Sequence, residues 1–169
     1  RKAFVSARNE ARKAFGNDVV FIESAISNAR HIEVQIWADE HGNVMAVGDR
    51  DCTIQRKNQK LIEIAPSPFL PEAVRQQMFE AAENLAREAS YTSVETVEFL
   101  YDPATEEFYF LEMNTRLQVE HTITEEVTGI DLVAGMIYSA QGGVLNTTQR
   151  PTPNGFAIEI RVNAEDPEG

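Results

Sequence analysis

The sequence predicts an α+β fold with largely antiparallel sheets and flanking helices. Two observations lead to this class. Apolar or alternating runs occur in two pairs, each joined by a turn-rich segment, and such pairs are typical of β-hairpins. Runs with apolar residues at helical spacing precede the first hairpin, separate the two hairpins and follow the second. Hairpins interrupted by helices favour an α+β domain over a parallel sheet, which needs strand and helix in strict alternation.

In the first 65 residues we expect a helix, an isolated strand, a hairpin and a further strand. Gly16 is suited to end the helix, because a left-handed residue follows many helix C-termini. The run VVFIESAI has the character of a buried strand, and the hairpin alternates apolar and polar residues around a DEHGN turn. The expected ranges are 2–15, 19–26, 32–38 with 44–47, and 61–65.

The remaining residues predict a long helix, a second hairpin, two shorter helices and a final strand. Pro71 can begin the long helix, because the first helical turn does not use the N–H that proline lacks. Gly129 is suited to end the first short helix, and Asp131 to cap the second. The expected ranges are 72–90, 96–101 with 108–113, 122–127, 132–141 and 156–162.

Composition limits the classes of function. The chain has 169 residues, of which 43% are hydrophobic, and this suits one domain with a core. A net charge of −12 argues against a nucleic-acid partner, which requires a basic surface. No apolar run is long enough to predict a membrane span, and the single Cys52 fits a reducing compartment. Because the chain begins with arginine and no closing element follows the last strand, we expect a fragment of a longer polypeptide.

The second hairpin carries one acid in each strand, Glu98 and Glu112, at positions symmetric about Thr105. If the hairpin closes symmetrically, both carboxylates point to one face, because side chains alternate along a strand. Two facing carboxylates repel each other unless a cation lies between them. Mg²⁺ typically binds one or two carboxylates and leaves its other positions to water and phosphates.

Polar residues continue after Glu112 at every second position, as Asn114, Arg116, Gln118 and Glu120. One interpretation is a strand with one solvated face. In a straight strand, however, Glu112 and Glu120 would be ~26 Å apart, at ~3.3 Å per residue. If these residues form one site, the chain must bend after Asn114, so we expect residues 114–120 to be a loop laid along a substrate.

The segment 49–60, DRDCTIQRKNQK, concentrates cations and amides in a strongly acidic chain. It is compatible with a solvated charged loop and equally with an anion-binding segment, since cations and amide donors suit phosphate or carboxylate. His31, just ahead of the first hairpin, is more often structural than a ligand at such a position.

Six segments together resemble biotin carboxylase, the ATP-grasp component of biotin-dependent carboxylases. They are RHIEVQI at 30–36, DRDCTIQRKNQK at 49–60, TVEFL at 96–100, FYFLEMNTRLQVEH at 108–121, TGIDLV at 128–133 and RVNAEDP at 161–167. The resemblance runs from about Arg8 to the end in the family's order and spacing, and EMNTRLQVEH is its most specific part. Asn58 in RKNQK makes the chain most similar to the propionyl-CoA type of acyl-CoA carboxylase.

The resemblance implies an ATP-grasp fold and the first half-reaction of biotin carboxylation. ATP phosphorylates bicarbonate to carboxyphosphate, this breaks down to CO₂ and phosphate, and biotin captures the CO₂. ATP and Mg²⁺ (or Mn²⁺) are the implied cofactors and biotin the carboxyl acceptor. Another ATP-grasp ligase that forms an acyl phosphate, such as a carbamoyl-phosphate synthetase half, is the alternative enzyme, and an inert domain is the non-enzyme alternative.

The resemblance also implies residue roles. Glu98, Glu112 and Asn114 would hold the metal on the ATP phosphates, and Glu120 would deprotonate bicarbonate. Bicarbonate itself would be bound by Lys60, Arg116, Gln118, Val119 and Glu120, and Arg161 would stabilise the developing enolate of biotin. The catalytic set is therefore Glu120, Arg116, Arg161 and Lys60. The ATP-binding set is Glu23, Ile26, His31, Gln55, Asn58 and Leu100.

Four residues depart from the usual family pattern: Ser24 replaces a common Lys, Asn58 a His, Glu95 a Gly and Thr122 a Pro. Thr122 removes a fixed φ just after the proposed base. The family's N-terminal domain, its glycine-rich lid and most of its C-terminal domain are not represented in residues 1–169. The chain would therefore be the central ATP-grasp portion, inactive alone.

The implied partners of the parent enzyme are a biotin carboxyl carrier protein or domain and a carboxyltransferase, and the parent is expected to be a homo-oligomer. The expected location is the cytoplasm, or the mitochondrial matrix in a eukaryote.

Overall fold

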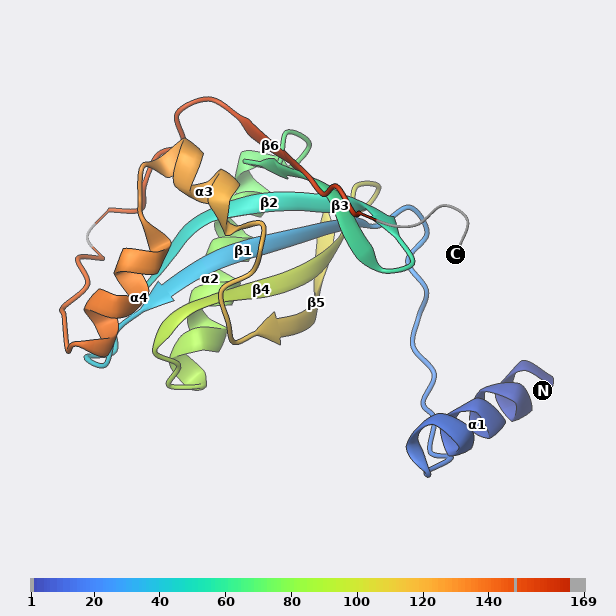
Figure 1. Ribbon diagram of the computed structural model, residues 1–169. Coiled ribbons are helices and arrows are strands. Elements are labelled where there is room, and N and C mark those ends of the chain that lie inside the picture. The colour runs from blue at the N-terminus through green and yellow to red at the C-terminus, as the bar shows by residue number, and fades with distance from the viewer. Residues whose placement is uncertain (1, 148, 165–169) are drawn as a thin grey trace.

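The computed structural model describes residues 2–147 and 149–164. One antiparallel sheet of six strands, in the order β5-β4-β1-β2-β3-β6, forms the body of the domain, with helices on both of its faces (Figure 1). The elements are α1 (Lys2–Phe15), β1 (Arg30–Ala38), β2 (Val44–Arg56), β3 (Gln59–Ala65), α2 (Glu72–Glu88), β4 (Ser93–Asp102), β5 (Glu107–Asn114), α3 (His121–Thr128), α4 (Leu132–Ala140) and β6 (Ala157–Ile160).

The main apolar core lies between α2 and one face of the sheet. Alternate residues of β1, such as Ile32, Val34 and Ile36, are fully buried there against Val74 and Met78 of α2. The helix contributes these side chains at a spacing of three to four residues, which places them on one stripe. The long helix and the two hairpins predicted from the sequence are confirmed. Burial of the apolar stripe of α2 holds this helix on one face of the sheet.

The opposite face of the sheet is covered by α3 and α4 and is polar at its centre. Trp37 packs with residues of α4, and Ala65 packs with Ile123 of α3, so apolar clusters lie at the two ends of this face. Between them, Glu33 and Arg50 are fully buried. Buried charges are costly unless they are paired, so this polar centre indicates a functional layer rather than a second core.

The predicted helix ends are also confirmed. Gly16 and Gly129 follow α1 and α3 with φ of 69° and 71°, in the left-handed region. The Asp131 side chain accepts a hydrogen bond of 2.7 Å from the Ala134 N–H and caps α4. Helix α1 contains no buried residue and stands apart from the sheet, joined to it by an extended segment (Figure 1).

One prediction from the sequence is wrong, and one of two open interpretations is excluded. Residues 19–26 form no strand: they belong to the extended segment after α1, pair with no strand among the described residues, and leave Phe21 80% exposed. Residues 49–60 are not a loop, because β2 continues to Arg56 and β3 begins at Gln59. The strand accommodates its charges because they pair within the domain, Asp49 with Arg75 and Arg50 with Glu33.

Glu95 makes the stability of the domain depend on pH. It lies on β4, is fully buried, and neither carboxylate oxygen has a hydrogen-bond partner within residues 2–147 and 149–164. Burial raises its pKa from 4.5 to about 7. The folded state therefore holds a proton that the unfolded chain releases above pH 4.5, so stability falls as pH rises from 4.5 to 7. We expect Glu95→Gln to raise the free energy of unfolding at pH 8 by ~2 kcal/mol, but not at pH 4.5.

Urea denaturation at both pH values measures this difference. Glu88→Gln, at the exposed end of α2, is the matched control and should change stability at neither pH. An equal gain for Glu95→Gln at both pH values would show that the glutamine packs better, and would contradict the protonation argument.

Candidate active site

The predicted face-to-face acids of the second hairpin are confirmed. Glu98 of β4 and Glu112 of β5 are direct partners in the ladder, and a register shift follows between Glu98 and Phe99. Strand β5 ends at Asn114, whose side-chain Nδ2 lies 3.0 Å from Glu98 Oε1 and 3.3 Å from Glu112 Oε1. The hairpin thus gathers two carboxylates and one amide at the end of β5.

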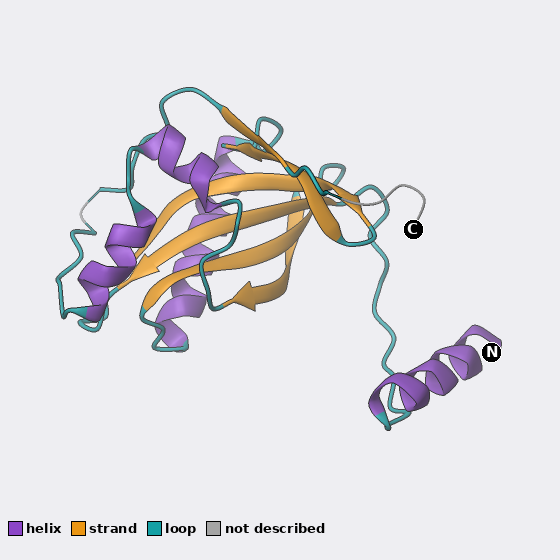
Figure 2. Ribbon diagram, in the orientation of Figure 1, coloured by secondary structure: helices purple, strands orange, loops and turns teal. Residues whose placement is uncertain are grey.

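The predicted bend after Asn114 is also confirmed. The loop that follows β5 runs back across the sheet to α3, where Glu120 occupies the N-cap position (Figure 2). Gln118, in this loop, donates a hydrogen bond of 3.1 Å from Nε2 to Glu98 Oε1. Glu120 is only 3% exposed. The bend removes the separation that a straight strand would impose, and the distant halves of the motif face one site.

Lys60 joins these halves. Its Nζ lies 2.8 Å from Glu98 Oε1, 2.8 Å from Glu120 Oε1, and also contacts Glu33 Oε2. One ammonium therefore serves three carboxylates from three parts of the chain. Three donors on a tetrahedral nitrogen allow one hydrogen bond to each acid.

The charges of this cluster keep Glu98 ionised. Burial alone would raise its pKa, but hydrogen bonds from His31 and Lys60 outweigh this and lower the pKa of Glu98 to about 2. Burial likewise disfavours the charged form of Lys60, yet the negative charge of Glu33 raises the pKa of the ammonium well above its usual value. Both groups are charged near neutral pH, as a site for a cation and an anion requires.

His31 and Gln55 extend the cluster along β1 and β2. His31 Nε2 lies 2.6 Å from Glu98 Oε2, and Gln55 Nε2 lies 2.7 Å from His31 Nδ1. The Gln55 amide also donates to the Cys52 carbonyl oxygen at 2.8 Å. His31 therefore belongs to the site through Glu98, although its position before a strand favoured a structural role.

These groups line a cavity of about 720 Å³. It contains twelve of the fifteen residues assigned from the resemblance, together with Gln59 and Leu111. The twelve are His31, Gln55, Asn58, Lys60, Glu98, Glu112, Asn114, Arg116, Gln118, Val119, Glu120 and Arg161.

The other three assigned residues do not line the cavity. Glu23 and Ile26 lie in the extended segment before β1, with Glu23 exposed, and Leu100 is half-buried on β4 beside His31. Their proposed contact with a nucleotide base stays a prediction.

Sequence reasoning missed Glu33 as a site residue, and it included Arg50 only as a member of the segment 49–60, without a role. Both are fully buried beneath the cavity, and Arg50 Nε donates to Glu33 Oε1. Alternation did place Glu33 on the polar side of its predicted strand, and this was the available signal. Without the neighbouring strands, nothing distinguished that side from a solvated face.

The carboxylates Glu98 and Glu112 fit a divalent cation. They are paired directly across the ladder, where like charges destabilise a sheet. Asn114 donates to both of them, and turning its amide by half a rotation would present Oδ1 at the same point. Two carboxylates and an amide oxygen form the oxygen-rich ligand set that Mg²⁺ prefers.

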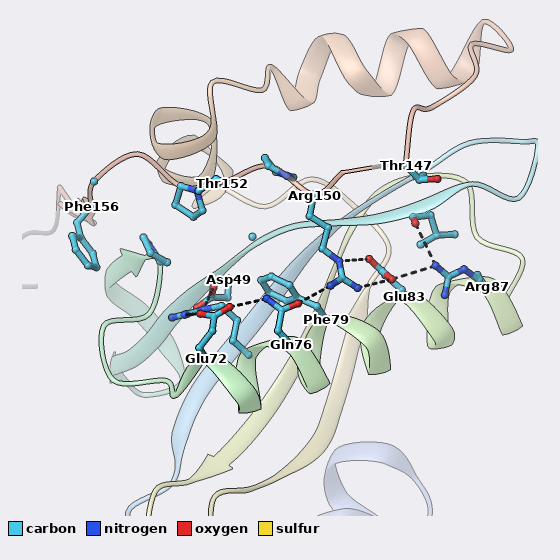
Figure 3. A pocket seen from close by; sticks show the side chains of 17 residues that line it. Asp49, Glu72, Gln76, Phe79, Glu83, Arg87, Thr147, Arg150, Thr152 and Phe156 are labelled. Atoms are coloured by element: carbon cyan, nitrogen blue, oxygen red, sulfur yellow. Dashed lines mark hydrogen bonds and ion pairs between the residues drawn. The ribbon is translucent and has the colours of Figure 1, made fainter.

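A second cavity, of about 810 Å³, lies between α2 and the segment that precedes β6 (Figure 3). Its charged groups are already paired with one another: Asp49 and Glu72 with Arg75, and Glu83 with Arg87 and Arg150. Arg150 Nε lies 2.9 Å from Glu83 Oε1, and this contact holds the segment on the helix (Figure 3). The arrangement is that of a structural clamp, and the candidate site is the smaller cavity.

Comparison with known proteins gives a consistent result. The family model described as "Carbamoyl-phosphate synthase L chain, ATP binding domain" matches residues 1–148. The propionyl-CoA carboxylase alpha chain of Ruegeria pomeroyi is 53% identical over 168 residues, which cover 99% of this chain and 24% of that protein. The biotin carboxylase of a Nostoc species is also 53% identical and is covered to 37%. The chain thus spans about a quarter to two fifths of these relatives.

Solved structures agree with the sequence relatives. A biotin carboxylase complex with β,γ-ATP from Campylobacter jejuni superposes with a TM-score of 0.88 at 47% identity, over 98% of this chain and 37% of that one. The biotin carboxylase domain of Hydrogenobacter thermophilus 2-oxoglutarate carboxylase, a dimer complexed with MgADP and bicarbonate, gives 0.87 at 45% identity, over 99% and 37%. The ATP-grasp fold expected from the sequence is confirmed.

Proposed function

Because the chain belongs to the family of the carbamoyl-phosphate synthase L chain ATP-binding domain, we propose that it is the central portion of a biotin carboxylase. The proposed activity is the ATP-dependent carboxylation of biotin by bicarbonate. One observation carries the proposal: Lys60 touches both Glu98, in the half of the cavity suited to a metal and nucleotide, and Glu120, in the half suited to bicarbonate.

The nucleotide half would hold ATP with its divalent cation. Glu98, Glu112 and Asn114 would bind the ion, which neutralises phosphate charge when it is present. Mg²⁺ is the favoured ion because the solved relative carries MgADP, and Mn²⁺ takes the same oxygen ligands. His31, Gln55 and Asn58 line this part of the cavity and would contact the ribose and phosphates.

The bicarbonate half would perform the proton transfer. Glu120 accepts the proton of bicarbonate, and a bicarbonate oxygen then attacks the γ-phosphorus while the bond to the β–γ bridging oxygen breaks. The products are carboxyphosphate and ADP. Arg116 and Gln118 would orient the anion together with Lys60 and the backbone at Val119, since a guanidinium grips a carboxylate at two points. The ion pair with Lys60 holds Glu120 in place despite Thr122.

The later steps involve partners beyond this chain. Carboxyphosphate would break down to CO₂ and phosphate, and N1 of biotin would capture the CO₂. Arg161, which lines the cavity just after β6, would stabilise the enolate oxygen of biotin. Biotin would arrive on a carrier protein or domain, and a carboxyltransferase would use the product. Dimerisation of the intact enzyme is compatible with the dimer seen in a solved relative.

The location of the enzyme follows from the same proposal. None of the helices within residues 2–147 and 149–164 combines the length and the apolar character of a membrane span. The relatives include bacterial proteins and proteins named as mitochondrial. By analogy with these relatives, we propose that the intact protein acts in the cytoplasm, or in the mitochondrial matrix if its source is a eukaryote.

ADP release by the intact enzyme tests the proposed function. We expect ATP cleavage to require bicarbonate and to rise when free biotin is added. ADP release that responds to neither would contradict the proposal. ADP release that depends on bicarbonate and ammonia, with carbamoyl phosphate as the product, would favour the synthetase alternative, which the relatives named above do not support.

Binding of Mg-ATP tests the metal assignment separately. We expect Glu112→Gln and Glu98→Gln each to weaken Mg-ATP binding by ~10-fold or more, because each removes a charged oxygen ligand from a site with few of them. Calorimetry on the isolated chain measures the affinity. Glu107→Gln, on the same strand but outside the cavity, is the matched control. Equal affinities in all four proteins would contradict the assignment.

A further inference from the structure

Arg50 is buried at the centre of the polar layer beneath the cavity. Its side chain is fully inaccessible to solvent. Nε donates to Glu33 Oε1, and Nη1 donates to Gln35 Oε1 and Thr124 Oγ1, both at 2.8 Å. A guanidinium cannot lose its charge in a protein, so a buried arginine with this many contacts fixes the geometry of everything that it touches.

These contacts form a closed ring with the proposed catalytic groups. Arg50 binds one oxygen of Glu33, and Lys60 contacts the other. Lys60 then reaches Glu120, the residue that immediately precedes α3. Arg50 returns to α3 through Thr124, one helical turn further on. Both ends of the Lys60–Glu120 pair are therefore tied to the same guanidinium.

The metal half of the cavity is tied differently. Besides Lys60, Glu98 contacts His31, Asn114 and Gln118, and none of these three is bonded to Arg50. Arg50 reaches β4 through one longer hydrogen bond, of 3.3 Å from Nη2 to Thr96 Oγ1, two residues before Glu98. Displacing Arg50 should consequently disturb the position of Glu120 relative to Lys60 more than it disturbs Glu98. The two halves of the cavity differ in their dependence on this one residue.

We infer that Arg50 is a positioning residue for the bicarbonate half of the site: through Glu33 and Thr124 it sets the approach of Lys60 to Glu120. The kinetic effects expected from this role rest on the proposed function. Arg50 itself makes no contact with substrate. Because a misplacement of ~1 Å can cost about 10²-fold in rate, a residue that acts only through others can still have a large effect.

Kinetics of the intact enzyme test the inference. In Arg50→Met we expect the KM for bicarbonate to rise by ~10-fold or more and kcat to fall, while Mg-ATP binding stays within about twofold. Arg50→Lys keeps the charge and one bond to Glu33, and should recover part of the loss. Thr124→Val removes only the link to α3 and should give a smaller change in the same direction. Arg75→Met, which breaks an ion pair with Asp49 on the other face, is the matched control.

A crystal structure of Arg50→Met supplies a readout that does not depend on activity. We expect Lys60 Nζ to have left Glu120 Oε1, from which it lies 2.8 Å in the wild type. A folded variant that keeps this distance and its bicarbonate KM would overturn the inference. So would equal losses of ATP and bicarbonate binding, which would indicate general damage. If Arg50→Met does not fold, Arg50→Lys and Thr124→Val decide by the same criteria. A wild-type enzyme without bicarbonate-dependent ATP cleavage would refute the proposed function. The distance between Lys60 Nζ and Glu120 Oε1 in Arg50→Met would still test the positioning role of Arg50.

Discussion

Replacing Glu120 with glutamine is expected to reduce bicarbonate-dependent ATP cleavage by ~10²–10⁴-fold, the usual contribution of a general base. The amide keeps the size of the side chain and can still accept a hydrogen bond from Lys60, which now lies 2.8 Å from the carboxylate. It cannot accept a proton from bicarbonate. Mg-ATP binding should be unchanged, because the metal half of the cavity is built on Glu98 and Glu112.

Steady-state ADP release and calorimetry with Mg-ATP together measure this separation. Glu126→Gln is a suitable control, because Glu126 is exposed on α3, close to the base in sequence but outside the cavity. If Glu120→Gln loses ATP binding in step with turnover, Glu120 belongs to the nucleotide site and the assignment of a base fails.

Lys60→Met is expected to have the second largest effect, and to damage both halves of the site. Glu98 and Glu120 would lose the cation that they share, whereas Glu33 would keep Arg50 as a partner. Turnover should fall by at least ~10²-fold, as for the loss of a preorganised charged group at a reacting anion. Removing one member of a buried ion-pair cluster typically costs ~3–5 kcal/mol, so a lower free energy of unfolding should accompany the loss.

Urea denaturation and turnover of the same preparation measure both effects. Lys57→Met provides a close comparison, because Lys57 is exposed in the turn between β2 and β3 and does not line the cavity. Near wild-type turnover in Lys60→Met would mean that the three carboxylates do not depend on a shared cation, and the electrostatic description of the site would then be wrong.

The parts of the fold that could be predicted are those that local pattern determines. Alternation placed Glu98 and Glu112 on one face of a hairpin, and helix-ending residues such as Gly129 and Asp131 occur at the expected positions. The bend after Asn114 required only a distance argument. In each case the relevant neighbours are close in sequence or joined by a tight turn.

The features that could not be predicted depend on distant neighbours. The run 19–26 has strand-like composition, but a strand exists only where another strand supplies hydrogen-bond partners, and no described strand lies beside this segment. Residues 49–60, which include Arg50, stay open between a charged loop and an anion-binding segment, because nothing local reveals Glu33, Gln35 and Thr124, the partners that bind Arg50. A buried charge is recognisable only after its partners are brought together.

The most direct test of the central claim is the fate of an oxygen atom. The proposal makes a bicarbonate oxygen the nucleophile that attacks the γ-phosphorus, so that oxygen must remain on the phosphate when carboxyphosphate breaks down. Cleavage of ATP by the intact enzyme in ¹⁸O-labelled bicarbonate should give inorganic phosphate that carries one labelled oxygen per turnover, as measured by mass spectrometry. Unlabelled phosphate released at the same rate would show that water attacks the phosphorus, and would contradict the account.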